Sequence, residues 1–300
     1  MPPRRREREG LNIQWYPGHM TKTRRMIEAD LKLVDLVAEV IDARIPRSSR
    51  NPDIDELVGR KPRLIVLNRA DQADPAQNRA WGRWFRDRGC AVLETDSKTG
   101  KGVDQFSNAA REALKEQIAR WREKGQVGRP VRVMVVGVPN VGKSTFINKV
   151  ARRKSAKAQD RPGVTRGKQW VAVDAGLDLL DTPGILWPKF EDQEVGRRLA
   201  YTGAIKDDIM DVEELGCALM EELAARYPQA LTDRYKLTPE PGIPGWELLE
   251  AAGRKRGFLI SGGEVDLSRM ARVLLDEFRG GKLGRFTFET PEGAGDHEEG

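Results

Sequence analysis

The chain has 300 residues, which is enough for about two domains that each bury a core of their own. Charged residues make up 33% of the chain and the net charge is +6, a balance that favours polyanionic partners. No apolar run approaches the ~18 residues of a membrane-spanning helix, so the composition argues against a membrane protein.

The amino terminus predicts a disordered basic arm on a cytoplasmic protein. Residues 1–10 carry four arginines beside prolines and a glycine, and no apolar core of a secretory signal follows them. The arm is as compatible with a solvated tail as with RNA binding. Cys90 and Cys217 lie far apart and lack metal-ligand spacing, so we expect free thiols in a reducing compartment.

Residues 11–193 alternate between short apolar runs and amphipathic stretches, which is typical of an α/β domain. The apolar runs predict strands at 35–41, 63–67, 91–94 and 131–136, and a β-hairpin at 168–173 and 177–180. Helical periodicity predicts helices at 21–33, 51–58, 81–88, 102–123 and 144–151.

After residue 193 the strands stop, which marks a second domain. Helical patterns are separated by loops rich in proline and glycine, and we expect helices at 194–206, 209–227, 244–256 and 266–280. The sequence therefore predicts a helical domain over 194–289 that closes with a short strand at 285–288. Residues 290–300 are expected to form an acidic tail.

A phosphate-loop motif, G-x-x-x-x-G-K-[ST], occupies residues 137–145 between a predicted strand and a predicted helix. In such a loop, backbone N–H groups and the helix N-terminus surround the phosphates. Lys143 is expected to reach the β- and γ-phosphates, and the Ser144 hydroxyl to hold Mg²⁺. The predicted nucleotide contacts are Pro139, Asn140, Val141, Gly142, Lys143, Ser144 and Thr145.

Two earlier segments predict guanine recognition. Residues 68–71 match the N-K-x-D motif except that Arg69 replaces lysine, and Asn68 and Asp71 hold the outer positions. The Asp71 carboxylate can accept from guanine N1–H and N2–H₂, which adenine does not offer, so the wrong base would leave it unsatisfied. Ser97 and Lys98 stand where a small loop would support the base.

Residues 181–184 match D-x-x-G, at the end of another predicted strand. Asp181 would support Mg²⁺, and the Gly184 N–H would bond the γ-phosphate. Thr165, in a basic loop with no clear period, is the expected second sensor of Mg²⁺ and γ-phosphate. Lys143, Thr165 and Gly184 are therefore candidate catalytic residues.

The order of these motifs is unusual. Ras-like proteins carry the phosphate loop first, then the switches, then the base motifs, whereas here residues 68–71 and 96–98 precede the phosphate loop. The sequence therefore predicts an α/β, circularly permuted Ras-like GTPase domain followed by a small all-helical domain. The permutation places the second switch directly before the helical domain, so loss of the γ-phosphate could move that domain.

The chain resembles the circularly permuted ribosome biogenesis GTPase A family. The resemblance covers about residues 11–289 and rests on segments 15–20, 42–46, 137–145, 162–165, 181–185 and 203–205. It implies a GTP-binding protein that associates with the large ribosomal subunit precursor, through rRNA and ribosomal proteins. Apart from this resemblance, we expect the protein to be a monomer. It also implies that the helical domain binds RNA. Arg69 departs from the usual lysine, but an arginine can still lie along the base plane.

The water-positioning group has no obvious candidate next to D-x-x-G. Ras-like proteins place a glutamine there, but this chain has Ile185, whose apolar side chain cannot orient water. His19 is the only histidine outside the acidic tail, and the resemblance implies that the family uses the histidine of this P-G-H-M motif instead. The alternative is that His19 caps its helix.

Asn140 has two possible roles in the phosphate loop. The phosphate loop resembles those of potassium-stimulated GTPases, in which the carbonyl of this Asn helps to hold K⁺, although Asn is also a favoured turn residue.

The leading hypothesis for the function of the chain is a GTPase that docks on the large-subunit precursor with GTP and leaves after hydrolysis. The alternatives are an RNA-binding scaffold with negligible hydrolysis, and the same GTPase acting on another ribonucleoprotein such as the small subunit.

Overall fold

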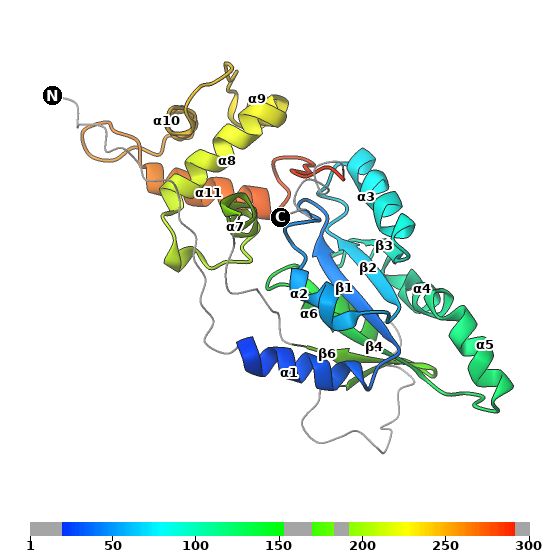
Figure 1. Cartoon of the computed structure of the whole chain (residues 1–300). Coiled ribbons are helices and arrows are strands. Elements are labelled where there is room, and N and C mark those ends of the chain that lie inside the picture. The colour runs from blue at the N-terminus through cyan, green and yellow to red at the C-terminus, as the bar shows by residue number, and fades with distance from the viewer. Residues whose placement is uncertain (1–19, 153–169, 183–191, 292–300) are drawn as a thin grey trace. The chain divides into compact units, whose positions relative to one another are not determined.

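The computed structural model describes residues 20–152, 170–182 and 192–291 (Figure 1). These residues fall into two compact units. The sheet unit comprises residues 20–152, 170–182 and 285–291, and the helical unit comprises residues 192–284. None of the helices in these ranges combines the length and apolarity needed to cross a bilayer.

The sheet unit is built on six strands in the order β3-β2-β1-β4-β6-β5 (Figure 1). Only β5 runs antiparallel to its neighbour. Every residue of β1 is buried, as expected for a central strand that is covered on both faces. The strands are β1 Leu36–Asp42, β2 Arg63–Asn68, β3 Ala91–Thr95, β4 Val131–Val136, β5 Trp170–Asp174 and β6 Leu177–Asp181.

Helices cover both faces of this sheet. On one face, Ile27 of α1 and Ile54 of α2 pack with Val37 and Met134 in one apolar cluster. On the other face, the rings of Phe106 and Phe146 from α4 and α6 pack edge to face at 5.1 Å. The helices of this unit are α1 Met20–Leu31, α2 Pro52–Val58, α3 Pro75–Asp87, α4 Phe106–Ala113, α5 Lys115–Glu123 and α6 Lys143–Arg152.

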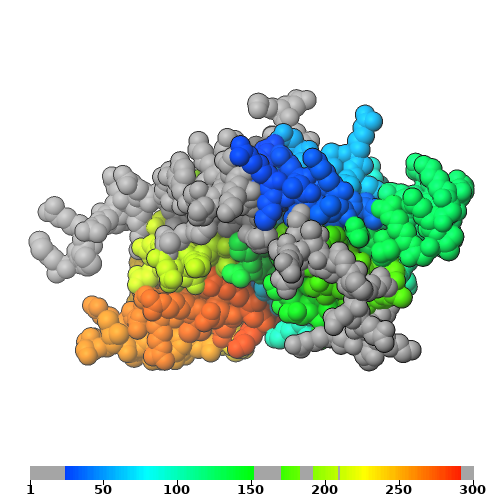
Figure 2. Space-filling view, turned by 90° about the horizontal axis from the view of Figure 1, so that it is seen from below, coloured from blue at the N-terminus to red at the C-terminus, as the bar shows by residue number. Residues whose placement is uncertain are grey.

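The predicted strands of the sheet unit agree with the structure to within two residues at each described end. The single helix expected at 102–123 was wrong, because a 3₁₀ turn at Val103–Gln105 precedes α4 and a break at Leu114 separates α4 from α5. Leu114 has φ −113° and ψ 13°, outside the helical region. The break redirects α5, which buries only Trp121, and Figure 2 shows its end as a green projection.

The helical unit packs its helices around α8. Gly216 and Gly245 allow this close packing, because a Cβ on Gly216 would lie 2.7 Å from Ala271 and one on Gly245 would lie 2.0 Å from the Cys217 carbonyl. Cys217 is a free, buried thiol. The helices are α7 Gln193–Tyr201, α8 Val212–Arg226, α9 Pro228–Tyr235, α10 Gly245–Lys255 and α11 Leu267–Arg279.

Two features of the helical unit differ from the sequence prediction. Helix α9 lies between the helices expected at 209–227 and 244–256, in a stretch that was predicted to be a loop. It begins at Pro228, and proline is well suited to the first helical turn. The first helix was expected to reach residue 206 but ends at Tyr201, since Gly203 adopts a left-handed conformation with φ 77°.

Residues 285–291 belong to the sheet unit, whereas the sequence analysis placed 285–289 at the end of the helical domain. The short strand expected at 285–288 is absent from this described segment, which has an irregular backbone. Its hydrogen bonds go to loops of the sheet unit instead of to a strand. Figure 1 shows the segment in red beside α3.

Candidate functional site

The phosphate loop leaves β4 and opens α6, as the motif requires. Gly142 has φ 91°, and a Cβ there would lie 2.4 Å from Nδ2 of Asn68. A Cβ on Gly137 would lie 2.6 Å from the carbonyl oxygen of Val40. Both positions therefore require glycine, and the resulting cradle of bare backbone fits a phosphate group.

Lys143 extends across the loop toward the end of β6. Its Nζ donates to the Asp181 carboxylate and to the Thr182 carbonyl. The Thr182 hydroxyl donates to the Val135 carbonyl at 2.7 Å, which fastens the end of β6 to β4. The ammonium group is thereby held at the carboxyl ends of both strands, where the phosphate loop begins.

The same edge of the sheet offers oxygen ligands suited to Mg²⁺. Ser144 is exposed at the start of α6, and Asp181 is half-buried at the end of β6. The residues that the structure describes contain no group of three or more Asp, Glu, His or Cys side chains that could hold a metal alone. A Mg²⁺ ion here would therefore take the rest of its coordination from phosphate oxygens and water.

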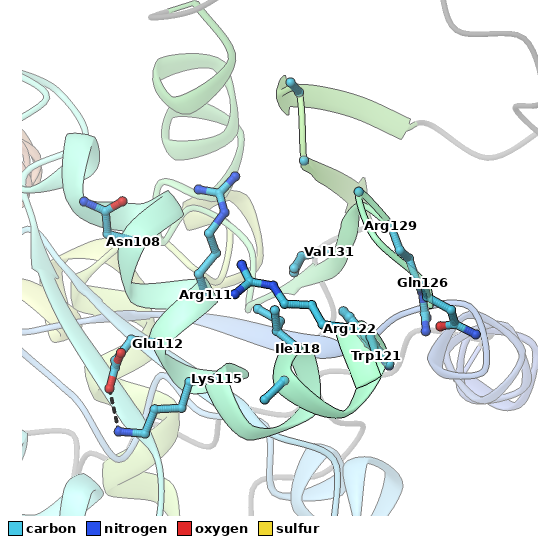
Figure 3. A pocket seen from close by; sticks show the side chains of 14 residues that line it. Asn108, Arg111, Glu112, Lys115, Ile118, Trp121, Arg122, Gln126, Arg129 and Val131 are labelled. Atoms are coloured by element: carbon cyan, nitrogen blue, oxygen red, sulfur yellow. Dashed lines mark hydrogen bonds and ion pairs between the residues drawn. The ribbon is translucent and has the colours of Figure 1, made fainter. Parts of the chain in front are cut away.

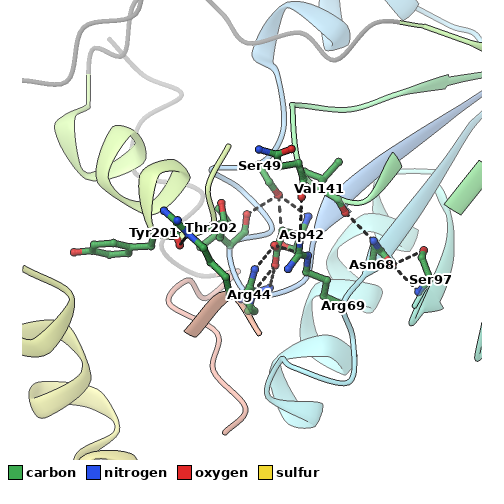
Figure 4. A network of polar contacts seen from close by, with 12 residues as sticks. Asp42, Arg44, Ser49, Asn68, Arg69, Ser97, Val141, Tyr201 and Thr202 are labelled. Carbon is green, nitrogen blue, oxygen red and sulfur yellow. Dashed lines mark hydrogen bonds and ion pairs between the residues drawn. The ribbon is translucent and has the colours of Figure 1, made fainter. Parts of the chain in front are cut away.

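Asn68 ties the base motif to both neighbouring loops (Figure 4). Its Oδ1 accepts from the Ser97 hydroxyl at 2.6 Å and from the Ser97 N–H at 3.1 Å. Its Nδ2 donates to the Val141 carbonyl of the phosphate loop at 2.7 Å. Both ends of this buried amide are satisfied, so the three loops are held in one arrangement.

Arg69 makes a second link between the base motif and the phosphate loop. It adopts a left-handed conformation with φ 59°, and its Nη2 donates to the Asn140 carbonyl at 2.9 Å. Its Nε lies 3.5 Å from Oδ2 of Asp42. The arginine at the usual lysine position thus bridges the phosphate loop and the end of β1.

Asp71 lies at the end of this motif and is exposed. Partial burial of its carboxyl group and the nearby charge of Asp96 raise its pKa, while the charges of Arg285 and Arg44 oppose the rise. Asp96 also shapes the neighbouring loop, because its Oδ1 accepts from the Lys98 N–H at 2.8 Å. An exposed carboxylate beside a fixed loop is well placed to accept from a planar base.

Sequence reasoning missed a buried ion pair beside the base motif. Asp42 and Arg44 are each about 1% exposed, and Oδ2 of Asp42 lies 2.8 Å from Nη2 of Arg44. Burial would raise the pKa of Asp42, but Arg44, by charge and hydrogen bonds, and Arg69, by charge, outweigh it and lower the pKa. Segment 42–46, which contains both residues, could have indicated this pair. It supported the family resemblance, but no structural or functional role was predicted for it.

A match to a family model described as 50S ribosome-binding GTPase covers residues 132–224. A ribosome biogenesis GTPase A of Bacillus cereus is 47% identical over 96% of this chain and 97% of its own length. The chain belongs to the ribosome biogenesis GTPase A family. A mitochondrial ribosome-associated GTPase 1 of Mus musculus is 34% identical over 91% of this chain and 88% of its own.

Solved structures of this family agree with the fold. The GNP-bound YlqF of T. maritima matches with a TM-score of 0.62 and 29% identity, over 90% of this chain and 99% of that one. A GDP-bound structure titled TM YlqF gives a TM-score of 0.66 over 89% of this chain and 100% of that one. The predicted family and permuted GTPase fold with a helical carboxyl-terminal part are confirmed, and the chain is a GTP hydrolase by family.

Several predicted site residues of this family member lie outside the described residues. These are His19, Thr165, Gly184 and Ile185. The structure brings together the other predicted groups, since the phosphate loop, Asn68, Arg69 and Asp181 all contribute to one edge of the sheet. Their roles toward nucleotide remain predictions.

A second hollow of the GTPase lies far from this edge. It has a volume of about 600 Å³ and is lined by residues of α4, α5 and the β5–β6 turn (Figure 3). It includes Val131, the first residue of β4, whereas the phosphate loop follows the last residue of that strand. Two of its arginines are paired, Arg111 with Asp174 and Arg129 with Asp35. The hollow is therefore separate from the nucleotide-binding edge.

Proposed function

We propose that this chain is a GTP-hydrolysing ribosome assembly factor that docks on the large-subunit precursor with GTP and is released by hydrolysis. The observation that carries the nucleotide part is the pair of hydrogen bonds from Asn68 and Arg69 to phosphate-loop carbonyls. These hydrogen bonds connect the residues proposed to recognise the base with the loop proposed to bind the phosphates. The ribosomal part is supported by the names of the relatives and by the family model.

In this proposal each residue has a defined task. Asp71 accepts from guanine N1–H and N2–H₂, and Lys143 exchanges its contacts with Asp181 for phosphate oxygens. Ser144 and Asp181 would hold Mg²⁺, which would supply positive charge that neutralises phosphate oxygens. Thr165 and the Gly184 N–H sense the γ-phosphate. His19 orients the attacking water. Asn140 would hold K⁺, which would supply positive charge during hydrolysis.

A short chain segment connects the proposed nucleotide site to the helical unit, which carries the proposed docking surface. Only residues 183–192 separate Thr182, which bonds the Lys143 ammonium, from the start of α7 in the helical unit. A change at the γ-phosphate therefore reaches the helical unit through little intervening chain. We propose that the helical unit binds rRNA and ribosomal proteins, and that the factor acts as a cytoplasmic monomer.

Sedimentation with ribosomal particles tests the docking part. The protein is mixed with mature subunits or subunit precursors in the presence of GDP or a non-hydrolysable GTP analogue. We expect co-sedimentation with the large-subunit precursor only in the analogue-bound state. Preference for small subunits would favour the same enzyme acting on another ribonucleoprotein.

Turnover measurements test the hydrolysis part. We expect phosphate release from GTP to rise when the large-subunit precursor is added. Negligible release with and without particles, together with tight GTP binding, would instead support an RNA-binding scaffold that uses GTP as a structural ligand.

A further inference from the structure

The segment that follows the helical unit is buried in the sheet unit. We call residues 286–289 the C-terminal strap. Phe286, Thr287, Phe288 and Glu289 are all at most 5% exposed. A segment near the end of a chain is usually exposed unless specific contacts hold it. The contacts of this strap therefore indicate what it holds in place.

The strap is bonded to the loop that follows β1. The Phe288 N–H donates to the Arg44 carbonyl at 2.9 Å. The Glu289 carboxylate accepts from the N–H groups of Arg47 and Ser48, at 2.6 and 3.1 Å, and from the Ser48 hydroxyl. Hydrogen bonds from N–H groups to a charged carboxylate are among the stronger ones in proteins, so this loop is firmly fixed.

The strap is also bonded to the loop that follows β2, which carries the base motif. The Phe286 N–H donates to the carbonyl of Gln72, the residue next to Asp71, at 2.9 Å. The Asp74 N–H donates to Oγ1 of Thr287 at 3.1 Å, and the same hydroxyl donates to the Ala43 carbonyl at 3.3 Å. One side chain thus bridges the loop that follows β1 and the loop that carries the base motif.

The buried ion pair of Asp42 and Arg44 connects the strap to the phosphate loop through Arg69 (Figure 4). Arg44, whose carbonyl accepts from the strap, pairs with Asp42. Asp42 lies 3.5 Å from Arg69, which donates to the Asn140 carbonyl. Backbone contacts and this ionic network therefore both lead from the strap to groups assigned to nucleotide binding.

We infer that the C-terminal strap positions the guanine-reading loop, with Thr287 and Glu289 as positioning residues for Asp71. The inference rests on the proposed role of Asp71 in reading the base. A strap that only stabilised the fold would lower the melting temperature without changing base preference. A positioning strap changes the discrimination between bases that differ at the group that Asp71 recognises.

The test compares nucleotide affinities of full-length variants. Thr287→Val removes the bridging hydroxyl at nearly constant volume, whereas Thr287→Ser retains it. Affinities are measured for GDP, inosine diphosphate and ADP, together with the melting temperature. Hypoxanthine lacks the 2-amino group of guanine, so the ratio of the affinities for GDP and inosine diphosphate reports how well Asp71 meets the base.

We expect Thr287→Val to reduce both the GDP affinity and this ratio about three- to tenfold, the scale of one displaced hydrogen bond. Thr287→Ser should retain the values of the unmodified chain. Glu289→Gln should shift both quantities in the same direction as Thr287→Val. Glu264→Gln, on an exposed residue of the helical unit, is the matched control and should change neither quantity.

An unchanged ratio in Thr287→Val and Glu289→Gln overturns the inference, whatever happens to the melting temperature. If Thr287→Val does not fold, Glu289→Gln decides alone by the same criterion. Equal affinity of the unmodified chain for GDP and ADP would instead reject Asp71 as the base reader. The two failures are therefore distinguishable.

Discussion

Arg69 donates from Nη2 to the backbone carbonyl of Asn140 at 2.9 Å, across 71 positions of sequence. The contact joins the base motif to the phosphate loop, so it holds the two predicted parts of the nucleotide site together. An arginine can make this contact while Nε faces Asp42, because its guanidinium donors point in several fixed directions. A lysine offers one compact ammonium for both partners.

Base choice should depend on Asp71. Asp71→Asn replaces an acceptor with a donor where guanine presents N1–H and N2–H₂, so GTP should lose its advantage. We expect GDP affinity to fall by about 10²-fold or more, because one guanine donor is left facing an amide donor. Competition among GTP, ATP and xanthosine triphosphate measures the change.

Xanthosine triphosphate provides the control for this variant. Xanthine carries a carbonyl where guanine has the 2-amino group, so the amide of Asp71→Asn should favour it. Equal binding of ATP and GTP by the unmodified protein would refute the assignment of Asp71.

Much of this site could be predicted because its residues are adjacent in sequence. The phosphate loop, residues 68–71 and Asp181 each follow an apolar run, and parallel strands place such positions at one edge of the sheet. Periodicity also located all six helices of the sheet unit, although it merged α4 and α5 into one. Local sequence patterns were sufficient to predict those elements whose structure is determined by residues adjacent in the chain.

Long-range contacts could not be predicted in this way. Glu289 bonds backbone N–H groups more than 240 positions away, and no local pattern distinguishes this carboxylate from those of the acidic tail. Arg44 reads as an exposed loop residue in sequence, but its partner Asp42 and the strap above it bury it.

The buried pair should contribute strongly to stability. Asp42→Asn leaves the Arg44 guanidinium buried without its counter-charge, which typically costs about 3–5 kcal/mol. Denaturant unfolding monitored by circular dichroism measures the loss. Glu112→Gln, which breaks the exposed pair with Lys115, is the matched control and should have little effect.

The stability difference should also depend on pH. The folded-state pKa of Asp42 is lowered, so its stabilisation is complete above the unfolded value of about 3.9 and is lost as pH falls through the folded pKa. The gap between the unmodified chain and Asp42→Asn should therefore close below about pH 4. A gap that stays constant into strong acid would contradict this account.

Potassium should accelerate hydrolysis if Asn140 helps to hold the ion. We expect faster turnover in K⁺ than in Na⁺ at equal ionic strength, because K⁺ would place charge beside the β–γ bridge. The Asn140 carbonyl already accepts from Arg69, so the ion would share that oxygen or use the side-chain oxygen. Asn140 has φ 59°, a conformation that asparagine favours in turns, and identical rates would leave it that role alone.

Asn140→Gly distinguishes the two oxygens. Glycine tolerates the left-handed backbone, so the turn should persist while the side-chain oxygen is removed. Stimulation that survives would assign the ion to the backbone carbonyl. Stimulation that disappears, with GTP affinity retained, would assign it to the side chain.

Association with ribosomal particles should weaken steeply with salt if lysines and arginines contact phosphates. The basic run 254–256 is the candidate in the helical unit, but Arg256 lies 3.2 Å from Glu277 and over the ring of Tyr235. Replacing Arg256 would therefore disturb the packing of the helical unit. Joint replacement of Arg254 and Lys255 by alanine is therefore the cleaner test of RNA contact.

We expect the double variant to bind particles more weakly and to lower the salt slope by about 1–2, with GDP binding intact. Lys124→Ala, an exposed lysine of the sheet unit, is the matched control. Salt-insensitive association would point to docking through protein contacts alone.

We expect His19 to position the attacking water, because Ile185 cannot and the family resemblance gives this role to the histidine of the P-G-H-M motif. The helix after His19, α1, leads into β1, whose end carries Asp42 beside the base motif. His19→Ala should bind GTP and melt normally, while particle-stimulated hydrolysis falls by about 10²-fold or more, the scale of a lost general base. A helix cap predicts the reverse, with lower stability and unchanged turnover per folded molecule. Full stimulated turnover in well-folded His19→Ala would transfer the role to a group supplied by the ribosomal particle.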